Sequence, residues 1–227
     1  MIPKILSEKN TLLFEDSHEH SYPKCWRHKS PVIYRLTPQW FIDISGNNNN
    51  LRKINIESIE KVIFFPKWGK DRLKTMLENR PDWCVSRQRV WGVPLPIFIN
   101  KKTKEPLKDQ KVIDRIASIY EKQGSDCWFT DDPKVFLSND YNPNDYEKLN
   151  DIVEVWFDSG STHSFVLEKR KDLKWPADMY LEGSDQHRGW FHSSLLESCG
   201  TRGKAPFKSI LSHGFVVDGK GMKMSKS

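Results

Sequence analysis

Two polar segments near the C-terminus hold residue types that nucleotide sites use. The segment 182–186, Glu-Gly-Ser-Asp-Gln, offers carboxylates, an amide and a glycine whose backbone a ligand can approach. Such groups suit ribose hydroxyls and the ammonium group of a substrate. Lys223 and Lys226 stand three positions apart in a stretch of serines and glycines, and lysine binds phosphate as a point charge. The two segments together predict a nucleotide site in which two lysines meet the phosphates.

Both segments also have simpler interpretations. Ser184 or Asp185 could cap a helix by accepting hydrogen bonds from its first free amides. Lys223 and Lys226 could belong to a solvated basic tail. Their position after a strand and a glycine-rich turn favours the phosphate site, because the neighbouring serines can hold the loop through bonds to its backbone.

Other residues give weaker indications of a site. Tryptophans usually belong to a core, but near a polar rim they could line a pocket for an apolar ligand group; the three concerned are Trp83, Trp91 and Trp190. A nucleophile with its base would need Asp158 or Ser159 to meet His163, and the sequence does not show that they meet. The patterns Gly-x-x-x-x-Gly-Lys-Ser/Thr and Gly-x-Ser-x-Gly are absent from the sequence.

Composition is compatible with a nucleotide- or RNA-binding protein. The 227 residues could form one large domain or two small ones. Lysine and arginine number 36 against 30 aspartates and glutamates, a net charge of +6. That mild excess suits nucleotides or RNA, although a lysine-rich surface alone would also produce it.

The cysteines predict a reducing, cytoplasmic setting without structural zinc. They are spread along the chain with no Cys-x-x-Cys pair, and no secretory segment opens the sequence. Cys25 and His28 have a ligand-like spacing near His18 and His20, but a zinc site needs about four well-placed ligands. No run of 18 apolar residues is present that could span a membrane.

Hydrophobic patterning predicts an α/β fold with a small insertion. We expect strands at 32–36, 39–42, 152–157, 177–181 and 209–217, helices at 70–79, 112–122 and 188–199, and turns at 46–50 and 218–221. Charged residues set 99–150 apart as an inserted module. Strand, helix and strand in succession favour a parallel sheet, and ligands bind outside the carboxyl ends of such strands. The loops 158–161, 182–188 and 218–227 are therefore expected to cluster at one site.

Longer motifs resemble those of class I aminoacyl-tRNA synthetases, in particular the isoleucine branch of the bacterial or organellar type. The motif Asp-Trp-Cys-Val-Ser-Arg-Gln-Arg-Val-Trp-Gly-Val-Pro at 82–94 is similar to a signature of that branch. The motif Tyr-Leu-Glu-Gly-Ser-Asp-Gln-His-Arg-Gly-Trp-Phe at 180–191 is close to diagnostic for it. Segments 155–161, 213–215 and 223–227 complete a likeness that is weakest in 43–62 and 100–150.

The resemblance implies a fold and a division of the chain. The fold would be the second half of a Rossmann-like nucleotide-binding domain. Residues 1–42 would be the tail of an editing insertion and the return to the catalytic domain, and 43–99 a catalytic segment. Residues 100–150 would be a small connective insertion, and 151–227 the catalytic half that ends in the Lys-Met-Ser-Lys-Ser loop.

The resemblance also implies roles for individual residues. Trp91 and Trp190 would line the isoleucine pocket. The aminoacyl-adenylate would be contacted by four residues: Glu182, Gly183, Asp185 and Gln186. His213 and Val217 would lie near the adenine. Lys223 and Lys226 would be the catalytic lysines, with Lys226 also contacting ATP.

By the same resemblance, the reaction would be activation of isoleucine by ATP, with Mg²⁺, followed by transfer to tRNA-Ile. The His-Ile-Gly-His motif of the family is absent from the sequence. We therefore expect a catalytic-domain fragment that is inactive alone and needs a complementary N-terminal half. A non-catalytic relative that binds nucleotide or RNA, and a plain basic RNA-binding module, are the alternatives.

Overall fold

The computed structural model describes residues 2–25, 27–46 and 50–224. The chain forms two units, Met1–Pro38 and Gln39–Ser227. In the first unit, helix α1 (Ile2–Glu8) has no buried residue among those described, and a single bridge joins Lys24 to Pro31. The strand predicted at 32–36 is wrong: the Val32 amide donates to the Pro23 carbonyl at 3.2 Å, but the segment forms no strand, and Ile33 is 84% exposed.

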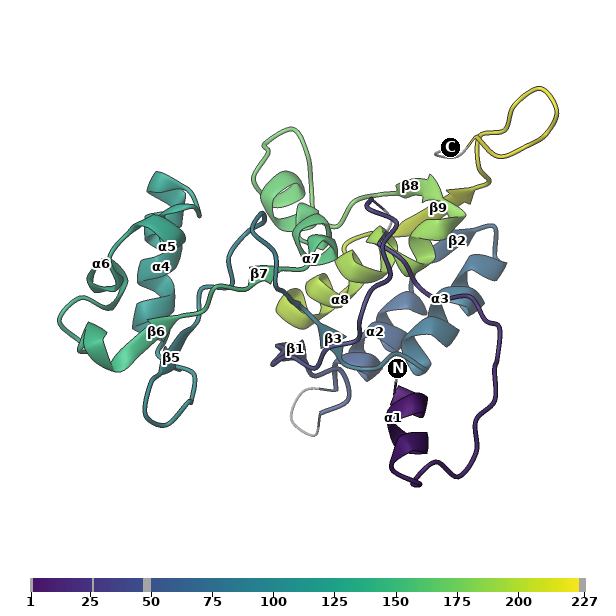
Figure 1. Ribbon diagram of the computed structural model, residues 1–227. Helices are drawn as coiled ribbons and strands as arrows, with labels where there is room; N and C mark the ends of the chain where they lie inside the picture. The colour runs from purple at the N-terminus through teal and green to yellow at the C-terminus, as the bar shows by residue number, and fades with distance from the viewer. Residues whose placement is uncertain (1, 26, 47–49, 225–227) are drawn as a thin grey trace. The chain divides into compact units, whose positions relative to one another are not determined.

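The second unit contains the remaining helices and strands, labelled in Figure 1. Its helices are α2 (Leu51–Ile59), α3 (Trp68–Glu78), α4 (Gln110–Gln123), α5 (Cys127–Thr130), α6 (Pro133–Leu137), η1 (Pro143–Asp145), α7 (Val155–Gly160), η2 (His163–Glu168), η3 (Ser184–Arg188) and α8 (Trp190–Arg202). Its strands are β1 (Phe41–Ile42), β2 (Ile63–Phe65), β3 (Trp83–Cys84), β4 (Ser86–Arg87), β5 (Phe98–Asn100), β6 (Tyr146–Lys148), β7 (Ile152–Val153), β8 (Tyr180–Gly183) and β9 (Ser209–His213).

The second unit contains a parallel sheet in the order β2-β9-β8. Strands β8 and β9 pair from Tyr180 opposite Ile210 to Gly183 opposite His213, and α8 connects them. This arrangement confirms the predicted strand–helix–strand unit and the α/β class. The predicted strand at 209–217 ends earlier, at His213, and the one at 177–181 begins later, at Tyr180.

The main core joins this sheet to α2, α3 and α8 (Figure 1). Leu73 and Leu77 lie one turn apart on α3 and are fully buried, which confirms the helix predicted at 70–79. Leu195 and Leu196 are buried in the same way on α8. Gly203 ends α8 with a φ of 71°, a left-handed conformation that favours glycine.

Residues 98–146 form a second hydrophobic cluster around Trp128, which is fully buried. The side chain of Asp109 accepts a hydrogen bond from the Lys111 amide at 2.8 Å and so starts α4, which confirms the helix predicted at 112–122. Ile113, expected on its apolar side, is 49% exposed. Strands β5 and β6 pair antiparallel at the base of this cluster. The finer domain division stays a prediction.

The strand predicted at 152–157 is largely wrong. Only β7 is extended, and it pairs antiparallel with β4 rather than joining the parallel sheet. The chain turns at Glu154 into α7, so 158–161 is helix and turn and not a loop at the carboxyl edge of the sheet. Short apolar runs fit a helix or a strand equally well, which explains the error. Of the turn predicted at 46–50, residues 47–49 lie outside the described residues, and Asn50 caps α2.

Candidate functional site

The carboxyl ends of β8 and β9 bring several predicted residues together. Gly183 pairs with His213 across the two strands, and Glu182 lies beside them at the surface. A Cβ atom on Gly183 would stand only 2.7 Å from Oδ1 of Asp185. A side chain here would displace the exposed Asp185 carboxylate, whereas glycine leaves the backbone of the strand end bordered by a carboxylate and an imidazole.

Gln186 connects this edge to α8. Its Oε1 accepts a hydrogen bond from the backbone N–H of Trp190 at 2.8 Å, while its Nε2 donates to Asp185 at 3.2 Å. A side-chain amide thus satisfies one of the free amides at the start of α8. Neither Ser184 nor Asp185 makes a side-chain cap, so the capping interpretation of those two residues is wrong.

The three tryptophans are not brought together. Trp190 stacks on Tyr180 with ring centroids 4.1 Å apart, and its Nε1 donates to the Ser159 carbonyl at 3.0 Å. Trp83 is buried in the core against Phe157. Trp91 is 92% exposed and borders a hollow that neither Trp83 nor Trp190 lines. The predicted roles of Trp91 and Trp190 in an isoleucine pocket stay predictions.

A hairpin carries the chain onward from β9. Val217 pairs with Lys223 in an antiparallel bridge, and the Met224 amide donates to the Val216 carbonyl at 3.0 Å. Asp218 closes the tip, which confirms the turn predicted at 218–221, because its Oδ1 accepts two backbone hydrogen bonds at 2.9 Å. The Lys223 ammonium lies 3.5 Å from the centroid of the Phe215 ring. Lys226, the residue predicted to contact ATP, lies outside the described residues.

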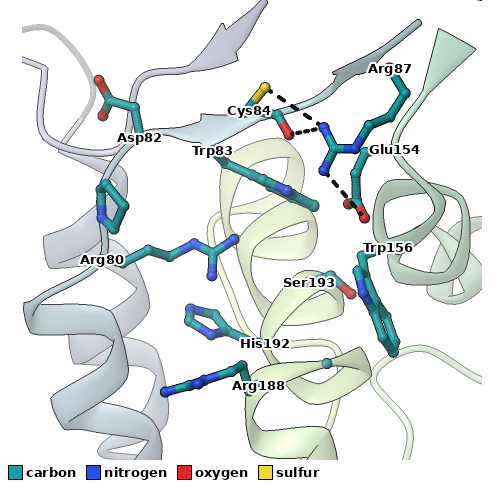
Figure 2. Close-up of a pocket in the computed structure, with 12 residues that line it drawn as sticks. Arg80, Asp82, Trp83, Cys84, Arg87, Glu154, Trp156, Arg188, His192 and Ser193 are labelled. Atoms are coloured by element: carbon teal, nitrogen blue, oxygen red, sulfur yellow. Dashed lines mark hydrogen bonds and ion pairs between the residues drawn. The ribbon is translucent and has the colours of Figure 1, made fainter. Parts of the chain in front are cut away.

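A cavity of about 300 Å³ opens beside this edge, between β3, α7 and the start of α8 (Figure 2). On one side Arg80, His192 and Arg188 lie one above another. On the other side Arg87 forms an ion pair with Glu154 at 3.8 Å. Sequence reasoning missed this group, because Arg80, Glu154 and Arg188 are far apart in the chain and no motif signals that they converge.

His192 is the most unusual member of this group. It is 2% exposed, and neither ring nitrogen has a hydrogen-bond partner in the described part of the chain. Burial, with the cations of Arg80 and Arg188 nearby, lowers the pKa of His192 to about 3. The imidazole is therefore neutral at physiological pH and presents one donor and one acceptor.

Acidic groups collect between α7 and α8. Burial, with Asp158 and Glu154 nearby, raises the pKa of Glu197 to about 9. Its Oε1 is buried without a hydrogen-bond partner among the described residues. A Cβ atom added to Gly160 would lie only 2.1 Å from this oxygen. Glu197 is thus a neutral carboxylic acid near pH 7.

The nucleophile–base interpretation of 158–163 is not supported. Ser159 donates its hydroxyl proton to the Trp156 carbonyl at 3.3 Å. His163 is 1% exposed and donates from Nδ1 to the Gly160 carbonyl at 3.0 Å. Both groups are used in holding the turn, so neither is poised for nucleophilic chemistry.

The described residues show neither a metal cluster nor a membrane-spanning helix. Within residues 2–25, 27–46 and 50–224, no three His, Cys, Asp or Glu side chains come close enough to hold a metal ion. No helix in these ranges has the length and apolar character needed to cross a membrane.

Comparison with known proteins identifies the family. A family model described as tRNA synthetases class I (I, L, M and V) matches residues 7–227. The chain is 66% identical over 222 residues to the isoleucine–tRNA ligase of Pelagibacter ubique (strain HTCC1062), which covers 98% of this chain and 24% of that protein. It is 54% identical over 224 residues to the isoleucine–tRNA ligase of Coxiella burnetii (strain Dugway 5J108-111), with the same coverage of 98% and 24%.

Among solved structures, the crystal structure of Mycobacterium tuberculosis methionyl-tRNA synthetase bound by methionyl-adenylate aligns with a TM-score of 0.46 and 16% identity. The alignment covers 90% of this chain and 31% of that one. The chain spans about a quarter of the length of the curated relatives that it matches. The resemblance noted in the motifs is confirmed: the chain belongs to the class I tRNA synthetase family (I, L, M and V).

Proposed function

We propose that this chain is part of an isoleucine–tRNA ligase that activates isoleucine with ATP and transfers it to tRNA-Ile. The observation that carries the proposal is the edge at which Gly183 meets His213. At this edge the carboxylates of Glu182 and Asp185 lie beside the end of β9, which continues into the hairpin that carries Lys223. The chain is also 66% identical to a relative named isoleucine–tRNA ligase.

The first chemical step needs little from the protein beyond positioning. The isoleucine carboxylate attacks the α-phosphate of ATP, and pyrophosphate leaves. The attacking oxygen is already ionised, so no general base is required, and in-line alignment with neutralisation of phosphate charge can supply the rate. Mg²⁺ that arrives with ATP would neutralise part of that charge. In the second step a hydroxyl of the terminal ribose of tRNA-Ile attacks the aminoacyl carbonyl of the adenylate, an ester forms and AMP leaves.

Most of the predicted residues have a place in this scheme. Glu182 and Asp185 would hold the ammonium and ribose groups, and Gly183 would let the backbone approach the adenylate. His213 and Val217 would lie near the adenine. Lys223 and Lys226 would meet the phosphates. For Lys223 this requires the ammonium to leave the face of the Phe215 ring, which costs only about 0.5–1 kcal/mol at an exposed site.

The sheet also supports the proposal that a further part of the enzyme covers it. No described strand pairs with the outer edge of β8, and Leu181 and Met179 on that strand and beside it are 55% and 44% exposed. An unpaired edge with apolar side chains suits a complementary N-terminal half. We further propose a cytoplasmic location, because all four cysteines are free thiols.

Isoleucine-dependent exchange of pyrophosphate into ATP tests the function. The exchange is measured with the chain alone, and then with the remainder of the enzyme supplied. Exchange by the mixture supports the ligase. A folded mixture that binds ATP without exchanging pyrophosphate would favour the non-catalytic relative instead.

Single substitutions in the complete enzyme test the lysines. Lys226→Ala and Lys223→Ala should each lower the exchange rate about a hundredfold or more while leaving isoleucine affinity nearly unchanged, as expected for groups that act on the phosphates in the transition state. Lys171→Ala removes an exposed lysine outside the site and serves as the control. An unchanged rate in Lys226→Ala would remove that residue from the mechanism.

A further inference from the structure

We propose that the cavity of Figure 2 binds a phosphate group, held by Arg80, Arg188 and His192. This site is separate in its residues from the strand-end site: none of Glu182, Gly183, Asp185 and Gln186 lines it. The proposal stands on the cavity alone and does not depend on the proposed function.

Two cations that form no ion pair among the described residues are the first reason. Neither Arg80 nor Arg188 forms an ion pair with a carboxylate among the described residues. Arg80 is partly buried, and its Nε is fully covered without a hydrogen-bond partner in the described ranges. Its guanidinium instead lies 5.5 Å from the Trp83 ring centroid. Burial lowers the pKa of Arg80, and the nearby carboxylate of Glu154 opposes this shift without forming an ion pair; an anion in the adjoining cavity would stabilise the cation further.

The imidazole of His192 is the second, independent reason. It projects between the two guanidinium groups in Figure 2, and it is 2% exposed with both nitrogens unpartnered. Buried polar groups are almost always hydrogen-bonded, so an unmet ring N–H at a cavity wall indicates a missing acceptor. The ring is flanked by cations, so the acceptor that fits best is anionic.

The geometry favours phosphate over smaller anions. Two guanidinium forks and one imidazole N–H offer more donors than the two oxygens of a carboxylate can use, whereas phosphate has at least three acceptor oxygens. Arginine forks match phosphate in particular. Two acids also line the cavity: Asp82 accepts a hydrogen bond from the Ile44 amide, and Glu154 is paired with Arg87 on the opposite wall. Glu154 would repel an anion there and so directs the phosphate toward Arg80 and Arg188.

The same phosphate chemistry could come from a free ion or from a nucleotide. The cavity of about 300 Å³ has room for more than one phosphate. Trp156 borders it with a side chain that is 41% exposed, a surface on which a base could stack. The test therefore uses three probes: inorganic phosphate, pyrophosphate and uridine 5′-monophosphate. Uridine is the phosphate-free control.

Calorimetric titration of the purified chain at fixed ionic strength gives the affinity of each probe. We expect saturable one-to-one binding of at least one phosphate probe and none of uridine. Arg188→Gln and His192→Gln should each weaken binding about tenfold to a hundredfold, the range expected when a hydrogen bond to a charged group is lost. Arg72→Gln removes an exposed arginine of α3 that does not line the cavity, and it should change the affinity less than twofold.

Two further measurements keep the outcome decisive. Arg188 is exposed, so Arg188→Lys should fold even if His192→Gln does not; it keeps the charge but loses the fork and should still bind several-fold more weakly. The imidazole ¹⁵N signals of His192 should shift on phosphate binding. If uridine monophosphate binds tenfold tighter than phosphate, the source is a nucleotide, and comparable affinities indicate the free ion. Absence of saturable binding, or equal weakening by Arg72→Gln, would overturn the proposal.

Discussion

Replacing Glu197 by glutamine should stabilise the folded chain, and the gain should depend on pH. Glu197 has a folded-state pKa of about 9 against an ordinary value of 4.5, because it is buried with Asp158 and Glu154 nearby. In the unfolded chain the carboxyl ionises freely above pH 4.5, whereas in the folded chain it must stay protonated. The raised pKa therefore leaves stability intact below pH 4.5 and removes it progressively as the pH rises toward 9.

The size of the effect follows from the difference between the folded and unfolded pKa values of Glu197 and from the pH. Each pH unit between the two pKa values costs about 1.4 kcal/mol, so at pH 7 the ionisable group costs roughly 3 kcal/mol relative to a neutral one. Partial exposure of Glu197 to solvent reduces this, and we expect a gain of about 2–3 kcal/mol for Glu197→Gln at pH 7. At pH 4.5 the gain should shrink to a few tenths of a kcal/mol.

Urea denaturation between pH 4.5 and 8.5 measures the difference. The curves of the original chain and Glu197→Gln should diverge steadily with pH, while Glu121→Gln, at an exposed site on α4, should track the original chain throughout. A difference that does not change with pH, or a loss of stability at pH 7, would refute the assignment of Glu197 as a buried neutral acid.

Three further substitutions test the packing around the site. Gly160→Ala should destabilise the chain by about 1–3 kcal/mol, because its Cβ would lie 2.1 Å from Glu197 Oε1; an unchanged melting temperature would contradict this close contact. Gln186→Ala should cost about 1 kcal/mol through loss of the hydrogen bond to the Trp190 amide, seen as faster amide exchange at the start of α8, and equal exchange rates would argue against the cap. Trp128→Ala should cost about 3–5 kcal/mol and abolish protection in residues 98–146 while β8 and β9 keep theirs; loss of protection in both regions would show that they unfold together.

The elements with a strong helical period could be predicted from the sequence. Leu73 and Leu77 on α3 lie one turn apart and place apolar side chains on one face, and that pattern is local. Helix α8 is instead buried on several sides, and its apolar residues Leu195 and Leu196 indicated only that it belongs to the core. The parallel pairing of β8 and β9 followed from their separation by a helix. The edge formed by Gly183 and His213 could be anticipated for the same reason.

The remaining features depend on contacts that no local pattern encodes. Residues 152–157 look like a strand by composition, but the chain turns at Glu154 and β7 pairs with β4 instead of the parallel sheet. The group of Arg80, Arg188 and His192 arises only when α3, η3 and α8 pack together. His192 in isolation is one of several polar residues in α8, with nothing to mark it as part of a cavity.

The paired strands β5 and β6 have a consequence for how this protein can vary. Phe98 stands opposite Lys148, and the Leu95 amide donates to the Asp151 carbonyl at 2.9 Å. The two ends of the inserted segment therefore lie side by side where they join the rest of the fold. Closing a loop between adjacent ends costs an entropy that grows only slowly with loop length. The inserted segment between β5 and β6 can therefore change in length or be replaced during evolution with little effect on the stability of the rest of the fold.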